Sequence, residues 1–177
     1  MHPLIPQIIG ILAVVTFLLS YQQKKRLGII LFNTVSRGLY ILQYLLLGAF
    51  SGAVLDVLGM IASLIAAKKD APWLKKHLRL VVLSVNAVIV VVGLLLCKSF
   101  YDLLPIVGVL LHTGAFWLND ERIIRRISLL GSPFWFVYNL VSHAYGSAVG
   151  DLLTMGSILL AMIRYRKKKE AETSESK

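Results

Sequence analysis

Three ionisable side chains stand inside stretches that are otherwise apolar: Arg37, Asp56 and Asp151. Burying such a group at the centre of a bilayer costs about 2.5–3.5 kcal/mol on insertion scales, so each needs a reason to be there. The two aspartates lie in matching segments, AVLDVLGM over 53–60 and AVGDLLTM over 148–155. Two such carboxylates could simply lie near the membrane interface. With Arg37 as counter-ion they could instead form a polar centre that contacts a solute or only locks helices together.

Aromatic residues accompany these charges. Trp135 and Tyr138 lie one helical turn apart, and Trp135 precedes Asp151 by 16 residues, whereas Arg37 precedes Asp56 by 19. A three-residue deletion in the outer turn of the second copy would make Arg37 and Trp135 equivalent positions. An aromatic face with carboxylate acceptors suits a small polar solute. We therefore expect Arg37, Asp56, Trp135, Tyr138 and Asp151 to bind the substrate, although a lone Trp can also be a packing residue.

No catalytic or metal-binding pattern accompanies this group. His112 and His143 lie on different apolar stretches without the spacing of a metal site, and Cys97 is the only cysteine. The sequence therefore predicts neither an enzyme nor a cofactor. Pro133 falls well inside an apolar stretch, where a missing N–H can kink a helix. Such a kink would act as a hinge or as a fixed bend.

The elements that position these residues follow from composition. The chain has 177 residues, of which 57% are hydrophobic and 16% charged, with a mean hydropathy of +0.74. Soluble domains are about 25% charged, so these values predict an all-α polytopic membrane protein. About 20 apolar residues cross a bilayer. Seven candidate transmembrane helices are expected, over 4–20, 29–47, 52–67, 80–97, 104–118, 127–144 and 147–163.

The basic residues indicate how these spans are oriented. Of the 19 Lys and Arg residues, 17 follow the first, third, fifth and seventh spans. Cytoplasmic loops carry an excess of such residues, which predicts an outer amino terminus and a cytoplasmic carboxyl terminus in a bacterial inner membrane. The net charge of +10 then reflects contact with anionic lipid headgroups rather than nucleic acid. A homo-oligomer is left open.

The two aspartate segments are part of a longer repeat. A shift of 98 residues pairs residues of the first two spans with those of the fifth and sixth, and a shift of 95 pairs the third with the seventh. The fourth span keeps both copies in the same orientation, which predicts a parallel 3+1+3 architecture of a kind used by transporters. A duplicated bundle without a pathway is the alternative. The expected divisions are a first repeat (1–67), a basic linker (68–79), a linker helix (80–97), a second repeat (98–163) and a tail (164–177).

The repeat, the Trp135-x-x-Tyr138 run and the acidic residue 16 positions after Trp135 resemble the SWEET and SemiSWEET (PQ-loop) sugar transporters. In that pattern an asparagine contacts the substrate, and here Asp56 and Asp151 stand in its place. Arg37 stands where the first-half tryptophan would be. The resemblance implies a SWEET-like fold and alternating access, and the acidic replacements favour a cationic solute or proton coupling over a neutral sugar.

Over nearly the whole chain the sequence is similar to the bacterial YgjV family of inner membrane proteins. The similarity is carried by the segments 7–10, 20–23 and 103–108 and by the basic end after Arg164. This resemblance implies a membrane location and no particular chemistry. Together the residues predict a transporter of a small polar solute, with no nucleotide-driven motor because there is no phosphate-binding loop. The alternative is a non-transporting membrane assembly or sensory protein.

Overall fold

The computed structural model describes residues 4–156 and 159, and these residues contain helices and no strand. The elements are α1 (Leu4–Gln22), α2 (Arg26–Leu47), α3 (Phe50–Ala67), the short α4 (Pro72–Lys76), α5 (Leu78–Leu96), the 3-10 turn η1 (Phe100–Asp102), α6 (Leu103–Phe116) and α7 (Glu121–Val141). A final helix is described over 145–156. The fold is therefore all-α in its described part, as the sequence predicts.

Four of these helices, α1, α2, α3 and α5, are long and apolar enough to cross a membrane. The sequence predicts seven spans, and the other three predicted positions differ for separate reasons. α6 has only 14 residues. α7 is 21 residues long but begins with charged residues, Glu121, Arg122, Arg125 and Arg126, which lower its hydropathy. The last predicted span, 147–163, extends beyond the described residues.

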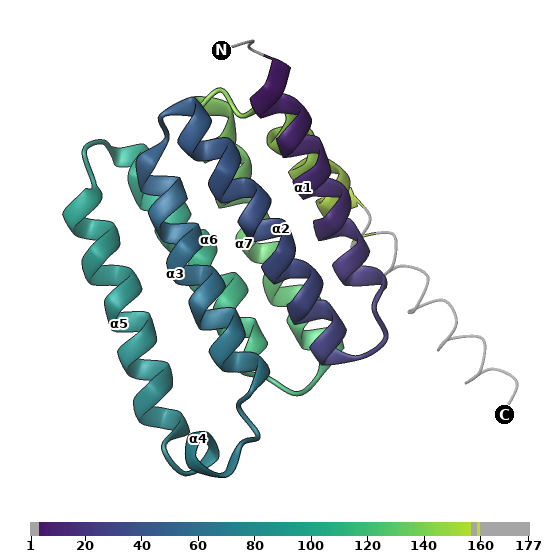
Figure 1. Ribbon diagram of the computed structural model, residues 1–177, viewed down its shortest axis with the longest axis vertical. Coiled ribbons are helices and arrows are strands. Elements are labelled where there is room, and N and C mark those ends of the chain that lie inside the picture. Colours follow the sequence, from purple (N-terminus) through teal and green to yellow (C-terminus); the bar gives the residue numbers. More distant parts are fainter. Residues whose placement is uncertain (1–3, 157–158, 160–177) are drawn as a thin grey trace, which may run out of the picture.

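The helices form two layers (Figure 1). α5, α3, α2 and α1 lie in one layer in that order, and α6, α7 and the helix over 145–156 lie behind it. Helices that follow one another pack together within each layer, and α3 contacts α6 across the layers. At the other edge the final helix meets α1, where the Gly146 N–H donates to the Gln7 side chain at 3.0 Å. α5 packs against the outside of α3 and α6.

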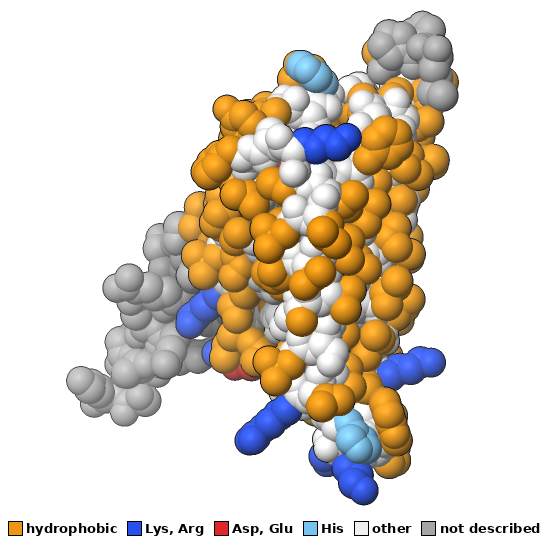
Figure 2. All heavy atoms as spheres, turned by 90° about the vertical axis from the view of Figure 1, so that its left-hand side faces the viewer, with side chains coloured by type: hydrophobic (Ala, Val, Ile, Leu, Met, Phe, Trp, Pro, Cys, Tyr) orange, Lys and Arg blue, Asp and Glu red, His pale blue; other side chains and the backbone are white. Residues whose placement is uncertain are grey.

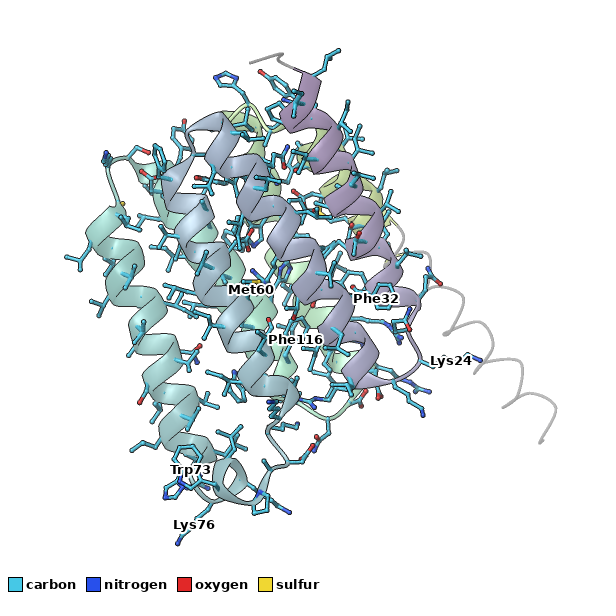
Figure 3. All side chains as sticks on the ribbon, viewed as in Figure 1. Lys24, Phe32, Met60, Trp73, Lys76 and Phe116 are labelled. Atoms are coloured by element: carbon cyan, nitrogen blue, oxygen red, sulfur yellow. The ribbon has the colours of Figure 1, made fainter. Side chains whose placement is uncertain are left out.

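We call the two ends of the helix bundle the basic end and the turn end. The basic end carries the connections 23–25, 68–77 and 117–120, and the turn end, uppermost in Figure 1, carries the turns 48–49 and 142–144. Lys24, Trp73 and Lys76 lie at the basic end in Figure 3. Of the predicted cytoplasmic cations, those from Arg164 onward lie outside the described residues. The described ones lie at the basic end, as the sequence pattern requires.

Large apolar side chains cover the outside of this bundle, and polar side chains are buried within its hydrophobic core. Large apolar residues are exposed along the helices, with Leu83 of α5 70% exposed and Val35 of α2 60% exposed. Hydrophobic side chains cover the middle of the face in Figure 2, and Lys and Arg side chains lie mainly toward its lower end. Inside, Asn33, Gln43 and Asn139 are almost fully buried. An apolar exterior with polar groups directed inward is the arrangement that a lipid environment favours.

The two turns at the turn end have the same geometry. Gly48 has φ 72° after α2, and His143 has φ 58° after α7, both in the left-handed region. The Ala49 N–H donates to the Tyr44 carbonyl at 2.9 Å, and the Ala144 N–H donates to the Asn139 carbonyl at 2.8 Å. Residues that occupy the same place before or after these two turns are 95 positions apart in the sequence, as Tyr44 and Asn139 are.

The matching geometry of these two turns corrects one prediction. The expected three-residue deletion in the second outer turn is absent, so the shift of 95 already applies within α2 and α7. Arg37 then corresponds to Ser132, and Trp135 corresponds to Tyr40. The predicted equivalence of Arg37 and Trp135 is wrong.

Candidate functional site

A cavity lies between the two layers. Its volume is about 20 Å³, which is room for about one water molecule. The residues that line it come from α1, α2, α3, α6, α7 and the final helix: Phe17, Asn33, Ser36, Arg37, Tyr40, Tyr44, Asp56, His112, Trp135, Asn139 and Asp151. The structure therefore brings together four of the five predicted binding residues, Arg37, Asp56, Trp135 and Asp151. Tyr138, the fifth, lies just beyond the lining.

Arg37 and Asp56 form a buried ion pair. Arg37, at the middle of α2, donates from Nη1 to Oδ1 of Asp56 on α3, and both residues are 3% exposed. The Arg37 Nε–H donates to Oδ1 of Asn33, one turn earlier on α2, at 3.1 Å. Within the described residues this is the only salt bridge. It neutralises one predicted carboxylate and ties α2 to α3.

Asp151 has a different partner. Its Oδ2 accepts a hydrogen bond from the Asn139 amide at 2.8 Å, and the Asn139 Oδ1 accepts one from the Tyr44 hydroxyl at 2.6 Å. Asp151 is 6% exposed. Tyr44 fixes the amide so that its N–H₂ group faces the carboxylate. This chain of three residues connects α2, α7 and the final helix across the cavity.

The lining is built from residue pairs separated by 95 positions. Asp56 corresponds to Asp151, and Tyr44 corresponds to Asn139, to which it is hydrogen-bonded. Phe17 corresponds to His112, and their ring centroids are 5.8 Å apart. Tyr40 corresponds to Trp135, and both line the cavity. Since two of these pairs are in mutual contact, the cavity lies where the two halves of the repeat meet.

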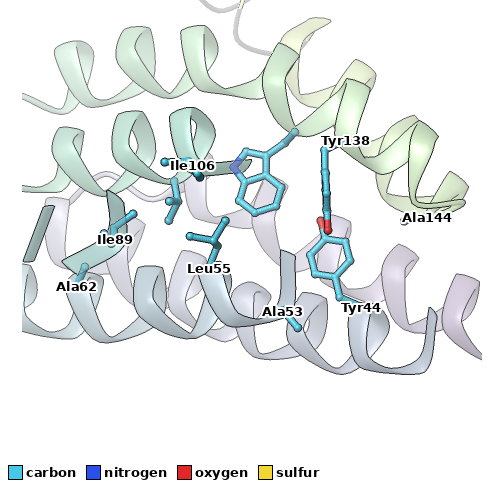
Figure 4. Packing of buried hydrophobic residues seen from close by; sticks show 10 residues of the cluster. Tyr44, Ala53, Leu55, Ala62, Ile89, Ile106, Tyr138 and Ala144 are labelled. Atoms are coloured by element: carbon cyan, nitrogen blue, oxygen red, sulfur yellow. The ribbon is translucent and has the colours of Figure 1, made fainter. Parts of the chain in front are cut away.

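Aromatic rings form one wall of the cavity. Tyr44 stacks on Tyr40, with centroids 6.3 Å apart, and on Trp135, with centroids 6.1 Å apart and planes at 15°. Tyr138 meets Tyr44 and Trp135 edge-on, as Figure 4 shows for the labelled Tyr44 and Tyr138. Stacked rings expose polarisable faces that can contact an apolar or cationic group.

Glycines on neighbouring helices make room for the large side chains. A Cβ at Gly59 would come within 2.5 Å of Nη1 of Arg37, and one at Gly108 would come within 2.5 Å of Nε1 of Trp135. A Cβ at Gly52 would come within 2.6 Å of the Tyr138 ring. Contacts this short do not occur between real atoms, so these three positions admit no larger residue without movement of the site.

Hydrogen bonds between the two halves close the turn end of the cavity. The Tyr138 hydroxyl accepts from the Gly52 N–H at 2.8 Å and lies 2.9 Å from the Ser51 hydroxyl. Gln43 and Ser147 are the counterparts of Tyr138 and Gly52 under the shift of 95 residues, and the Ser147 hydroxyl donates to Oε1 of Gln43. Tyr138, predicted as a binding residue, is therefore part of this closure next to the site.

Asp102 extends the closure outward. Its Oδ1 accepts from the Ser51 hydroxyl at 2.6 Å, and its Oδ2 accepts from the N–H groups of Lys98 and Ser99 at 3.0 and 2.9 Å. Partial burial alone would raise the pKa of this carboxyl. The hydrogen bonds from Ser51, Lys98 and Ser99 outweigh burial and hold the pKa below its usual value. Asp102 therefore remains an anionic acceptor at neutral pH.

Arg26 closes the basic end. From the start of α2 it donates from Nη2 to the carbonyls of Ala66, at the end of α3, and Phe116, at the end of α6, both at 2.6 Å. Its Nε–H also reaches the Leu118 carbonyl at 3.0 Å. One guanidinium thus binds the last carbonyls of two helices, which the helix dipole makes favourable acceptors of a cation.

Two more cations reinforce the basic end. The Lys69 ammonium donates to the Trp117 carbonyl at 2.7 Å, and Arg125 donates to the Gln23 carbonyl at 3.1 Å. Burial lowers the pKa of the Lys69 ammonium, and the neighbouring Arg26 guanidinium lowers it further. These contacts join segments of opposite halves, so hydrogen bonds hold the two halves together at both ends of the bundle.

The remaining predicted residues have simpler settings. Pro133 lies inside the continuous helix α7, and whether it acts as a hinge stays a prediction. The His112 ring contacts the Ser128 carbonyl at 2.9 Å. No group of His, Cys, Asp and Glu in the described residues has the arrangement of a metal site.

Sequence reasoning missed the residues that close the cavity, chiefly Gln43, Ser51, Ser147 and Arg26. Small polar residues and a basic loop residue carry no distinctive signal of their own. A constant shift of 95 residues would have paired Gln43 with Tyr138 and Tyr44 with Asn139, and so would have indicated part of this set.

The apolar exterior, the four long apolar helices and the buried charged centre define an integral membrane protein built from α-helices. The chain belongs to the Imp-YgjV family, described as a bacterial inner membrane protein, whose family model matches residues 4–169. No curated protein and no solved structure matches it.

The ion pair gives a prediction for stability. Arg37→Leu leaves Asp56 buried without its partner, and we expect a loss of about 3–5 kcal/mol in the free energy of unfolding. The double variant Arg37→Leu/Asp56→Leu removes both charges and should regain most of this loss. Unfolding of the purified protein in detergent micelles measures both. Equal destabilisation by the single and double variants would contradict the pairing.

Proposed function

We propose that this protein transports a small polar solute across the bacterial inner membrane by alternating access. The observation that carries the proposal is a charged cavity between two repeated halves, which hydrogen bonds join at each end of the bundle. A transporter needs a binding site that opens to either side in turn. Opening one closure and keeping the other would expose the cavity to one side at a time.

The size of the cavity fits this scheme. About 20 Å³ accommodates a water molecule but no sugar or amino acid, so the described conformation is the closed intermediate of such a cycle. Hydrogen-bonded closures are suited to reversible opening, because each bond contributes only about 0.5–1.5 kcal/mol net. The seven predicted helices would then act as a 3+1+3 bundle.

We propose no enzymatic activity and no cofactor for this site. The driving force would be a gradient of the solute or of protons. The partners would be the solute and anionic lipid headgroups at the basic end, where Lys75, Lys76 and Arg79 are exposed.

One observation favours a second function. The Arg37–Asp56 pair is internally satisfied and the cavity is nearly filled, as in a bundle whose polar residues only fix helix packing. A non-transporting assembly or sensory protein would need no more than this. Transport activity separates the two functions.

Transport is tested in proteoliposomes with three labelled probes of different charge: glucose, glycine and methylguanidinium. We expect one of them to enter faster than into protein-free vesicles, and we expect Asp151→Asn and Asp56→Asn each to lower that rate at least tenfold. Asp70→Asn, which changes an exposed carboxylate at the basic end, is the matched control and should leave the rate unchanged. No protein-dependent entry of any probe would favour the non-transporting alternative, and wild-type rates in both site variants would contradict the site.

The proposal also places the basic end in the cytoplasm, since cytoplasmic loops are rich in Lys and Arg. Cys97, the single cysteine, lies at the turn end, where α5 stops. An impermeant thiol reagent added to intact spheroplasts should label Cys97 and should not label Lys76→Cys in a Cys97→Ser background. The reverse labelling pattern would invert the orientation.

A further inference from the structure

The two halves of the cavity differ in one charge. In the first half, Asp56 pairs with Arg37. Under the shift of 95 residues, Asp151 is the second-half counterpart of Asp56, and Ser132 is the counterpart of Arg37. The Ser132 hydroxyl donates along its own helix, to the Ser128 carbonyl at 3.1 Å. Asp151 thus has the Asn139 amide as a donor and has no cationic partner among the described residues.

The other positions around Arg37 also have counterparts in the second half. Asn33, which accepts from the Arg37 Nε–H, corresponds to Ser128, and Gly59, which lies against the guanidinium, corresponds to Thr154. The Thr154 hydroxyl is fully buried and has no hydrogen-bond partner among the described residues, whereas the buried Ser128 hydroxyl neighbours that of Tyr21. Buried polar atoms without partners are rare in native structures.

We propose that a cationic N–H group of the transported solute, an ammonium or a guanidinium, binds in the cavity beside Asp151, in the half that has no arginine. This inference rests on the proposed transport function and specifies its substrate class. The Asp151 carboxylate is the counter-ion of the solute, and the unpartnered Thr154 hydroxyl, three residues further along the same helix, accepts one of its remaining N–H groups. The protein supplies the cation in one half, and the solute supplies it in the other.

Three properties of the site favour this ligand over others. An anion would face Asp151, a buried carboxylate that no described cation neutralises. A neutral sugar brings no positive charge to pair with the Asp151 carboxylate. The stacked wall of Tyr40, Tyr44 and Trp135 suits an organic cation, because aromatic faces attract positive charge.

Binding is measured on the full-length protein in detergent, as the concentration-dependent rise of its unfolding temperature. The probes are methylammonium chloride and methylguanidinium chloride, with sodium chloride at equal ionic strength and glucose as references. A ligand that binds only the native state stabilises it by mass action. We expect at least one organic cation to stabilise the wild type well beyond both references, and we expect Asp151→Asn to weaken its apparent affinity at least tenfold.

Two further variants allow the same test if Asp151→Asn unfolds. Thr154→Val keeps the size of the side chain and removes its hydroxyl, so it should weaken binding several-fold. Asp70→Asn removes an exposed carboxylate and should leave binding unchanged. Stabilisation by neither organic cation, stabilisation by sodium ions alone, or equal binding in the wild type, Asp151→Asn and Thr154→Val would each overturn the proposed ligand class.

The two proposals fail in different ways. Binding of an organic cation without its entry into proteoliposomes would support the cation site and refute transport. Entry of glucose or glycine without binding of either cation would support transport and overturn the cation site.

Discussion

The structure depends on the cost of burying charge in an apolar bundle. Arg37 and Asp56 lie inside a molecule whose exterior is apolar, and their mutual ion pair makes that location tolerable. Much of the site follows from this pair. Gly59 leaves space for the guanidinium, Asn33 accepts its Nε–H, and the pairing holds α2 against α3 at the wall of the cavity.

Repetition organises the rest of the molecule, and departures from repetition define the site. The hydrogen bond between Gln43 and Ser147 is the counterpart of the one between Tyr138 and Gly52. Each half is therefore bonded to the other at the turn end in the same way. Inside the cavity the repeat is broken, because the arginine of the first half is a serine in the second. Two similar halves thereby carry different charges, and the cation site proposed above rests on this difference.

The sequence predicted the parts of this arrangement that are costly in lipid. Arg37, Asp56 and Asp151 were identifiable because ionisable residues are rare in apolar stretches, and the structure brings all three to one cavity. Trp135 also lines this cavity, although the spacing argument that selected it rested on an equivalence with Arg37 that the structure contradicts. The helical fold followed from hydropathy alone.

Other features could not be predicted, for physical reasons. The repeat shift predicted for the first two helices was wrong. A few apolar residues coincide under a shift of 98, whereas the structure requires a shift of 95. The decisive turn uses His143 in a left-handed conformation where the first half uses Gly48, and no residue type marks that equivalence. The closures depend on Ser, Gln and backbone groups, whose partners become visible only in three dimensions.

We propose that one cavity opens in turn to both sides of the membrane. Ser36 is fully buried and lines that cavity. We therefore propose to introduce Ser36→Cys in a Cys97→Ser background and to measure its labelling by an impermeant thiol reagent in right-side-out and in inverted vesicles. Alternating access predicts slow labelling from both sides, competed by the transported solute. Labelling from neither side, with the introduced cysteine reactive after unfolding, would contradict the account.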